Sequence, residues 1–216
     1  MLDPRTLRLT VVTSGTLAPV HGHRVLAEAA VLGGATAVQL RARDLPDEAL
    51  LALATELAEL CRGNGVLFIV NNRLEVAVAS GADGVHLGQS DEPVAARRRL
   101  GPDRILGISV ADAVQARTAA SMGADYLGIT VWPTPTKPET KGQGPAGILE
   151  VRRAVPIPVV GIGGINRHNL AEVFEAGASG IAVISAVAGA TDPVAATREL
   201  RTLIDREAGA GGTTNR

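Results

Sequence analysis

The chain is poor in cysteine, in aromatic residues and in long apolar runs, and each shortage excludes a class of protein. Its single cysteine, Cys61, cannot form an internal disulfide and makes no metal-ligand cluster, so we expect a partly buried helical residue. Aromatic residues make up 2% of the chain and the formal net charge is -1, which leaves neither stacking side chains nor a basic field for nucleic acid. No stretch approaches the roughly 18 continuous apolar residues of a membrane-spanning helix. Residues 1–8 lack the apolar run of a signal peptide, so we expect a cytoplasmic protein.

The residues that the chain does contain are largely aliphatic. Hydrophobic residues make up 46% of its 216 residues, and with so few aromatics the core must be built from Ala, Val, Leu and Ile. Such a core is typical of parallel strands that are buried on both faces. The length suits one large domain, and single α/β barrels often have this length.

A short Gly-Ala motif occurs four times along the chain. Its copies begin at Gly34, Gly81, Gly123 and Gly177, and each follows an Ala/Leu-rich helical stretch and leads into a short apolar strand. The copies are separated by about two βα units each, so together they predict eight strands and eight helices.

The expected strands are short, apolar and bounded by Gly, Pro or Asn, at residues 8–13, 37–40, 67–70, 84–87, 105–109, 126–129, 159–162 and 180–184. Helical patterns fill the intervals, at residues 23–32, 47–62, 73–80, 93–100, 112–122, 148–154, 166–176 and 193–207, with Asn166 as an N-cap. Strict alternation gives either a doubly wound sheet or a closed barrel. The first strand is not followed by G-x-G-x-x-G, and the quasi-repeated units favour a barrel. We therefore predict a single (β/α)8 TIM barrel over residues 1–207 and a disordered tail at 208–216.

Polar residues collect where the predicted strands end, which is where barrels of this class carry their active sites. The polar residues at these ends are, in chain order, Gln39, Arg41, Arg43, Asn71, Asn72, His86, Gln89, Asp91, Ser109, Thr130, Thr134, Thr136, Lys137 and Ser185, and Gly163, Gly164 and Ile184 end the last two strands with them. Gln39, Arg41 and Arg43 alternate along one strand exit, so their side chains point the same way.

These residues predict two anion sites. Arg41, Arg43 and Lys137 are three cations converging on one mouth, and Asp91 is a candidate ligand for a hard cation such as Mg²⁺. The Gly163-Gly164 turn and Ser185 offer backbone N–H groups after the seventh and eighth strands, where these barrels commonly bind phosphate.

Each residue also has a purely structural interpretation. His86 on a buried strand suits a hydrogen-bonded core residue, Asp91 suits the start of a helix, and Asn71-Asn72 suits a turn. The structural interpretations weaken together, because all these residues fall on one face of one predicted barrel.

Seven short segments stand out in a fixed order along the chain: QLRAR at residues 39–43, NNR at 71–73, GADGVHLGQSD at 81–91, GIS at 107–109, PTPTK at 133–137, GIGGI at 161–165 and VISA at 183–186. In these motifs and their order, the chain resembles the thiamine phosphate synthase family. The resemblance implies a barrel transferase that joins hydroxymethylpyrimidine diphosphate to hydroxyethylthiazole phosphate and releases diphosphate.

The resemblance also implies roles for individual residues. The pyrimidine diphosphate would be held by Gln39, Arg41, Arg43, Asn71, Ser109 and Lys137, of which Arg41, Arg43, Ser109 and Lys137 would be catalytic. The thiazole phosphate would be held by Thr134, Thr136, Gly164, Ile184 and Ser185. Asn72 and Asp91 would hold Mg²⁺. A homodimer is a possible assembly.

Three positions depart from the family pattern. Arg43 and Asn72 stand where the family usually has Lys and Asp, and the stretch at residues 128–132 is one residue shorter than usual, beside the thiazole site. An amide can donate a carbonyl oxygen to a cation but no charge, so we expect weaker Mg²⁺ binding than is usual in the family.

Three other functions fit the same barrel. A thiazole tautomerase of the related family would use a histidine near the end of the sixth strand, where this chain has Ile129, Thr130, Val131 and Trp132. A Schiff-base aldolase would need a desolvated Lys137, which instead lies in a polar Pro/Thr loop. A non-catalytic sensor of phosphorylated ligands would have lost its metal site, as Asn72 suggests.

Overall fold

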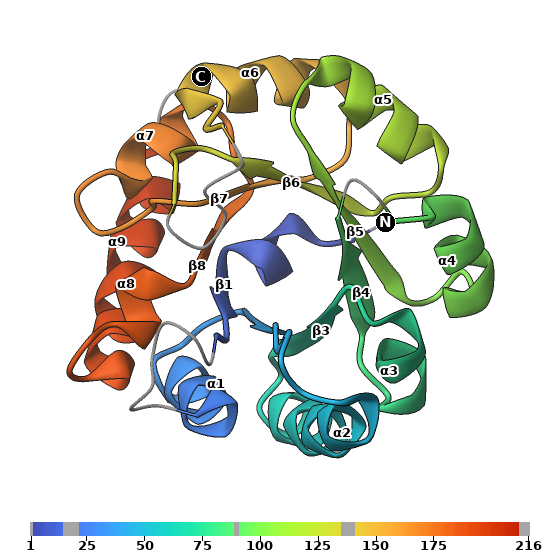
Figure 1. Cartoon of the computed structure of the whole chain (residues 1–216). Helices are drawn as coiled ribbons and strands as arrows, with labels where there is room; N and C mark the ends of the chain where they lie inside the picture. Colours follow the sequence, from blue (N-terminus) through green and yellow to red (C-terminus); the bar gives the residue numbers. More distant parts are fainter. Residues whose placement is uncertain (1, 15–21, 89–90, 135–140, 212–216) are drawn as a thin grey trace.

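The strands close into a barrel, as the sequence predicts. The computed structural model describes residues 2–14, 22–88, 91–134 and 141–211. Eight parallel strands pair in chain order, and β1 closes the barrel on β8. Figure 1 shows the α-helices as a ring outside these strands. The fold is therefore a single (β/α)8 barrel, in which the carboxyl ends of all strands meet on one face.

The strands are β1 (Leu9–Val12), β2 (Ala37–Leu40), β3 (Leu67–Asn71), β4 (Gly84–Leu87), β5 (Ile105–Val110), β6 (Tyr126–Thr130), β7 (Val159–Ile162) and β8 (Gly180–Val183). The helices are η1 (Pro4–Leu7), α1 (His23–Leu32), α2 (Asp47–Gly63), α3 (Leu74–Ala79), α4 (Pro93–Leu100), α5 (Ala113–Ser121), α6 (Gly144–Ala154), α7 (Leu170–Glu175), α8 (Ser185–Ala188) and α9 (Pro193–Gly211).

Some helix boundaries differ from the sequence prediction. α6 begins at Gly144 rather than residue 148, with a proline in its first turn, where the missing N–H is not needed. The prediction of Asn166 as the N-cap of α7 is wrong, because Asn169 is the N-cap residue of that helix. α9 runs to Gly211, past the predicted boundary at residue 207. The rest of the expected tail lies outside the described residues.

The repeated Gly-Ala motif joins each even strand to the odd strand before it. Asp83 shows how, since its backbone N–H donates to the Phe68 carbonyl at 3.0 Å while its Oδ2 accepts from the Phe68 N–H at 2.8 Å. Asp125 makes the same pair of bonds with Leu106, both at 2.8 Å. Thr36 does so with Leu9 through its Oγ1, both bonds at 2.9 Å. The motif therefore closes the ladder at the amino ends of the strands.

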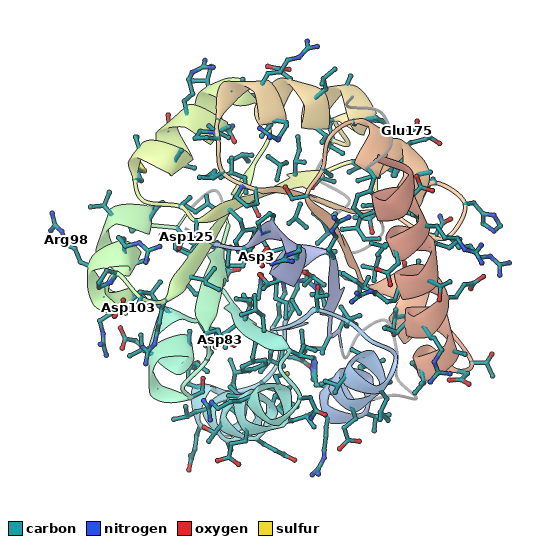
Figure 2. All side chains as sticks on the ribbon, turned by 180° about the vertical axis from the view of Figure 1, so that it is seen from behind. Asp3, Asp83, Arg98, Asp103, Asp125 and Glu175 are labelled. Atoms are coloured by element: carbon teal, nitrogen blue, oxygen red, sulfur yellow. The ribbon has the colours of Figure 1, made fainter. Side chains whose placement is uncertain are left out.

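Replacing Asp83 with alanine should lower the stability of the barrel. The change leaves the Phe68 N–H without its acceptor, which typically costs about 1–3 kcal/mol. For a chain of this size, about 2 kcal/mol corresponds to a fall in Tm of roughly 4–8 °C in a thermal melt. Asp103→Ala is the matched control, since Asp103 is exposed at the same end of the barrel (Figure 2) and accepts no hydrogen bond within the described part of the chain. Equal Tm values for the two variants would contradict the capping role.

The helix η1 closes the amino end of the barrel. It lies inside the ring of strands in Figure 1. Its Leu7 packs with Val12, Tyr126, Val160 and Ala182 in an apolar cluster inside the barrel. Because this end is filled, space for a ligand remains at the opposite end, where the strands terminate.

The single cysteine is buried in α2, as the sequence predicts. Burial, with a smaller contribution from Asp83, raises the pKa of the Cys61 thiol to about 12. A thiol in this state is an apolar packing group and not a nucleophile. Within the described residues, no helix is long and apolar enough to cross a membrane.

Candidate active site

A cavity of about 400 Å³ opens at the carboxyl ends of the strands. It brings together most of the residues that the sequence marks as a site. Those lining it are Gln39, Arg41, Arg43, Asn71, Asn72, His86, Ser109, Thr130, Thr134, Gly163, Gly164, Ile184 and Ser185, whereas Asp91 lies beside Asn72 and is not part of the lining. Lys137, Thr136 and Gln89 lie outside the described residues, so their roles stay predictions.

The cationic wall of the cavity comes from the end of β2. Arg41 is 9% exposed, and its backbone N–H donates to Thr13 Oγ1 at 3.3 Å, which fixes the strand exit. Arg43, two residues on, is exposed at the rim. A guanidinium keeps its charge even when buried, so Arg41 presents a poorly solvated cation to the cavity.

Beside this wall, two amide side chains lie against each other. Asn71 Nδ2 donates to Gln39 Oε1 at 3.1 Å, and Gln39 is 5% exposed. The contact consumes one donor and one acceptor and holds both amides in fixed orientations. Their remaining donors and acceptors suit a heterocycle with ring nitrogens and an amino group.

The two predicted metal ligands also meet. Asn72 Nδ2 donates to Asp91 Oδ2 at 2.8 Å, and the Gly88 N–H donates to the same oxygen at 2.7 Å. Asn72 has a φ of 64°, the one positive value among the non-glycine residues described, and asparagine tolerates this conformation better than most residues.

The donor set at this pair fits Mg²⁺. The two bonds just given do not use Asp91 Oδ1 or the side-chain oxygen of Asn72, Oδ1. A site of one carboxylate that is completed by phosphate oxygens and water is usual for this ion. The described residues hold no cluster of three or more His, Cys, Asp and Glu side chains, so a cation here would depend on its ligand's own oxygens.

The opposite wall is the glycine turn after β7. Gly163 and Gly164 have φ values of +90° and +68°, and Asn169 Nδ2 donates to the Gly164 carbonyl at 3.0 Å. Asn166 Nδ2 donates to the same carbonyl at 3.2 Å and its Oδ1 accepts from the His168 N–H at 2.9 Å, so Asn166 stabilises the turn between Gly164 and α7. Ile184 and Ser185, after β8, line the cavity beside it.

A hydrogen-bonded row of side chains crosses the cavity floor on β4, β5 and β6. His86 Nε2 lies 2.9 Å from Ser109 Oγ, and His86 Nδ1 lies 2.9 Å from the Tyr126 hydroxyl. The structural interpretation of His86 is thus confirmed, since it is a buried residue with hydrogen-bonded ring nitrogens. His86 and Tyr126 also line the cavity, so the row connects the core to the site.

Sequence reasoning missed several residues of the lining. Lys141 and Gln143 come from the segment before α6, and Arg73 lines a smaller adjoining hollow of about 180 Å³ with Arg41 and Arg43. Two signals were available: Lys141 is one of two lysines in the chain, and Arg73 belongs to the NNR segment. Neither signal fixes the direction of a side chain that lies beyond a strand end.

The cavity suits ligands that combine a flat ring with an anionic group. Its rim carries cations, amides and a glycine turn, whereas its floor includes Val12, Val160, Ile162 and Ala182. Such a cavity can hold flat organic rings on the apolar floor and anionic groups at two places on the rim.

Known proteins are similar to this chain in sequence and in structure. A family model described as thiamine monophosphate synthase matches residues 9–187. A thiamine-phosphate synthase of Chloroflexus aurantiacus is 47% identical over 199 residues, covering 91% of this chain and 92% of that protein. One of Moorella thermoacetica is 48% identical over 187 residues, covering 85% and 89%. The solved structure of a thiamine phosphate pyrophosphorylase from Pyrococcus furiosus superposes with a TM-score of 0.87 at 40% identity, covering 94% of this chain and 98% of that one.

Proposed function

Because the chain belongs to the thiamine monophosphate synthase family, we propose that the cavity at its barrel mouth holds a pyrimidine diphosphate and a thiazole phosphate side by side. The protein is a thiamine-phosphate synthase, a transferase of thiamine biosynthesis. The side chains and backbone groups on each wall of the cavity then indicate which substrate that wall binds.

The pyrimidine diphosphate belongs on the β2, β3 and β5 side of the cavity. The observation that carries this assignment is the buried Arg41 beside the Gln39–Asn71 amide pair. The amides orient the aminopyrimidine ring, and Arg41 and Arg43 bind the diphosphate, with Ser109 and Lys137 as further contacts. Fork-shaped guanidinium groups match phosphate oxygens in pairs, which fixes the leaving group in direction as well as in charge.

The thiazole phosphate belongs on the β7 and β8 side. Its phosphate accepts from backbone N–H groups of the turn at Gly164 and of Ile184 and Ser185, with Thr134 and Thr136 completing the contact. Two phosphate groups bound at opposite walls place the two rings in the middle of the cavity. The approach of the thiazole nitrogen to the pyrimidine methylene carbon is then set by binding alone.

Asn72 and Asp91 would hold Mg²⁺ against the diphosphate. When bound, the ion offsets negative charge on the leaving group. Asn72 offers a neutral oxygen and Asp91 a charged one, so most of the attraction to a cation comes from Asp91 and from the substrate.

The reaction is a substitution in which bond breaking leads. The bond between the methylene carbon and the diphosphate oxygen breaks, and the amino-substituted ring stabilises the cation that remains. The thiazole nitrogen then donates its lone pair to that carbon, giving thiamine phosphate and diphosphate. Arg41 and Arg43 stabilise the departing charge. The apolar floor keeps water from the cation, and no general base is needed because the attacking nitrogen carries no proton.

The assay is product formation by the purified chain with both phosphorylated substrates and Mg²⁺. We expect thiamine phosphate and diphosphate in equal amounts, and neither when one substrate is omitted. Binding of both ligands without product would instead indicate a sensor of phosphorylated compounds. Isomerisation of the thiazole alone would indicate a tautomerase, and borohydride trapping at Lys137 an aldolase. We also propose that the enzyme works in the cytoplasm, since charged diphosphates do not cross membranes. We propose a homodimer as its assembly.

A further inference from the structure

We propose that His86 and Tyr126 are positioning residues that fix the direction of the Ser109 hydroxyl, so that Ser109 donates a hydrogen bond into the cavity. The identity of the acceptor, an oxygen of the departing diphosphate, rests on the proposed function. The direction of the hydroxyl rests on the geometry of the three side chains alone.

The three side chains come from adjacent strands, β4, β5 and β6. Ser109 Oγ lies 2.9 Å from His86 Nε2, and the Tyr126 hydroxyl lies 2.9 Å from His86 Nδ1. The imidazole and phenol rings are tilted by 39° with centroids 5.4 Å apart. All three residues line the cavity, but Tyr126 is only 4% exposed and His86 9%, so little water reaches the two rings.

Two glycines make room for the rings. A Cβ at Gly107 would lie 2.3 Å from Tyr126 Cζ, and a Cβ at Gly128 would lie 2.9 Å from His86 Cε1. Real side chains do not approach so closely, so the Tyr126 ring packs directly on the backbone of β5 and the His86 ring on the backbone of β6. The absence of a side chain at these two positions is therefore required for the rings to lie where they do.

The Tyr126 hydroxyl determines which atom donates the proton in each hydrogen bond of this row. Within the described part of the chain, its hydroxyl has one hydrogen-bond partner, His86 Nδ1. Burial raises the pKa of Tyr126, so the hydroxyl keeps its proton. A buried hydroxyl proton needs an acceptor, and Nδ1 must be that acceptor.

The tautomer of His86 then sets the direction of the Ser109 proton. With Nδ1 accepting, the proton of the neutral imidazole is on Nε2, and Nε2–H donates to Ser109 Oγ. The Ser109 proton cannot point at the ring, because two hydrogens would meet. It points into the cavity, where an anionic oxygen is the acceptor that the proposed reaction supplies. In the opposite tautomer, Ser109 would present a lone pair to that oxygen and repel it.

The tautomer can be read directly from the ligand-free protein. Long-range proton–nitrogen NMR correlations distinguish Nε2–H from Nδ1–H imidazole, and the chain has four histidines, so the His86 signals are assigned by their loss in His86→Gln. We expect Nε2–H in the wild-type protein and a mixture in Tyr126→Phe, which keeps the ring and removes the hydroxyl. Nδ1–H in the wild-type protein would overturn the proposal, whatever the activity.

Kinetics test the consequence for the reaction. Tyr126→Phe should lower kcat by about 5–10-fold with the KM for the thiazole phosphate unchanged, since one oriented donor to the leaving group becomes less well aligned. His86→Leu should lower kcat by about 30-fold or more, whereas His86→Gln, whose amide can donate to Ser109, should recover most of that loss.

A double-mutant cycle separates positioning from a general effect on the barrel. In a Ser109→Ala background, Tyr126→Phe should have no further effect on kcat, because the group that it orients is gone. An equal loss in both backgrounds would overturn the proposal. If the wild-type protein made no thiamine phosphate, the proposed function would fail, while the NMR experiment would still decide the direction of the Ser109 hydroxyl.

Discussion

Arg41→Met should lower kcat/KM for the pyrimidine diphosphate by about 10²–10³-fold, because a buried cation facing developing negative charge contributes far more than an exposed one. Arg41 is 9% exposed and lines the cavity, so little water competes with the diphosphate for its guanidinium. Methionine keeps much of the apolar stem and removes the charge. Steady-state kinetics with the pyrimidine substrate varied at saturating thiazole phosphate measure the effect.

We expect Arg41→Met to affect the stability of the protein differently from its activity. Methionine removes the desolvation cost of the buried guanidinium, but it also removes the interaction that Arg41 makes within the protein, and these two changes oppose each other. We therefore expect the Tm of Arg41→Met in the absence of substrates to change far less than its activity. A lower Tm together with lower activity would indicate that Arg41 supports the fold more than the reaction.

Two controls bracket this result. Arg98→Met removes an exposed arginine that points away from the barrel (Figure 2) and should leave kcat/KM unchanged. Arg41→Lys keeps the charge but loses the paired donors, so it should recover only part of the activity. Activity of Arg41→Met within about threefold of wild type would contradict the assignment of the diphosphate to this wall.

The repeat explains why so much of the fold could be predicted. Each Gly-Ala copy leads directly into a buried apolar strand, and in three copies the third residue, Thr36, Asp83 or Asp125, binds the backbone of the preceding strand. Strand positions follow from such local signals. The barrel then places the carboxyl ends of all strands on one face, which is why residues far apart in sequence, such as Gln39 and Asn71, can be grouped from the sequence alone.

What could not be predicted depends on register and on loop paths. The partnership of His86 with Tyr126 requires β4, β5 and β6 to be aligned so that Gly107 lies opposite both residues, and no local pattern states this. Lys141 reaches the cavity because the segment before α6 is tied to β6, where the Gln143 N–H donates to the Thr130 carbonyl at 2.9 Å. Asn166 is not the cap of α7 because its Oδ1 accepts from the His168 N–H, in a turn that precedes the first residue of that helix.

Asn72→Asp should lower the Mg²⁺ concentration needed for half-maximal activity by about 10–100-fold. The wild-type pair offers one charged and one neutral oxygen ligand, and the substitution makes both charged. The backbone at residue 72 poses no obstacle, since its φ of 64° is one that Asp tolerates nearly as well as Asn. Activity titrated with Mg²⁺ at fixed substrate concentrations measures the change, and an indistinguishable metal dependence in the two proteins would refute the assignment.

A second measurement tests the same pair without turnover. In the wild-type protein, Asn72 Nδ2 donates to Asp91 Oδ2 at 2.8 Å, so the site is satisfied without a cation. In Asn72→Asp this bond is replaced by repulsion between two carboxylates, so the metal-free variant should melt at a lower temperature. Mg²⁺ should then raise its Tm more than that of the wild type, because an ion that binds the folded state alone stabilises it in proportion to its occupancy. Asp91→Asn is the complementary control: with no carboxylate left, neither Tm nor activity should respond to millimolar Mg²⁺ as the wild type does.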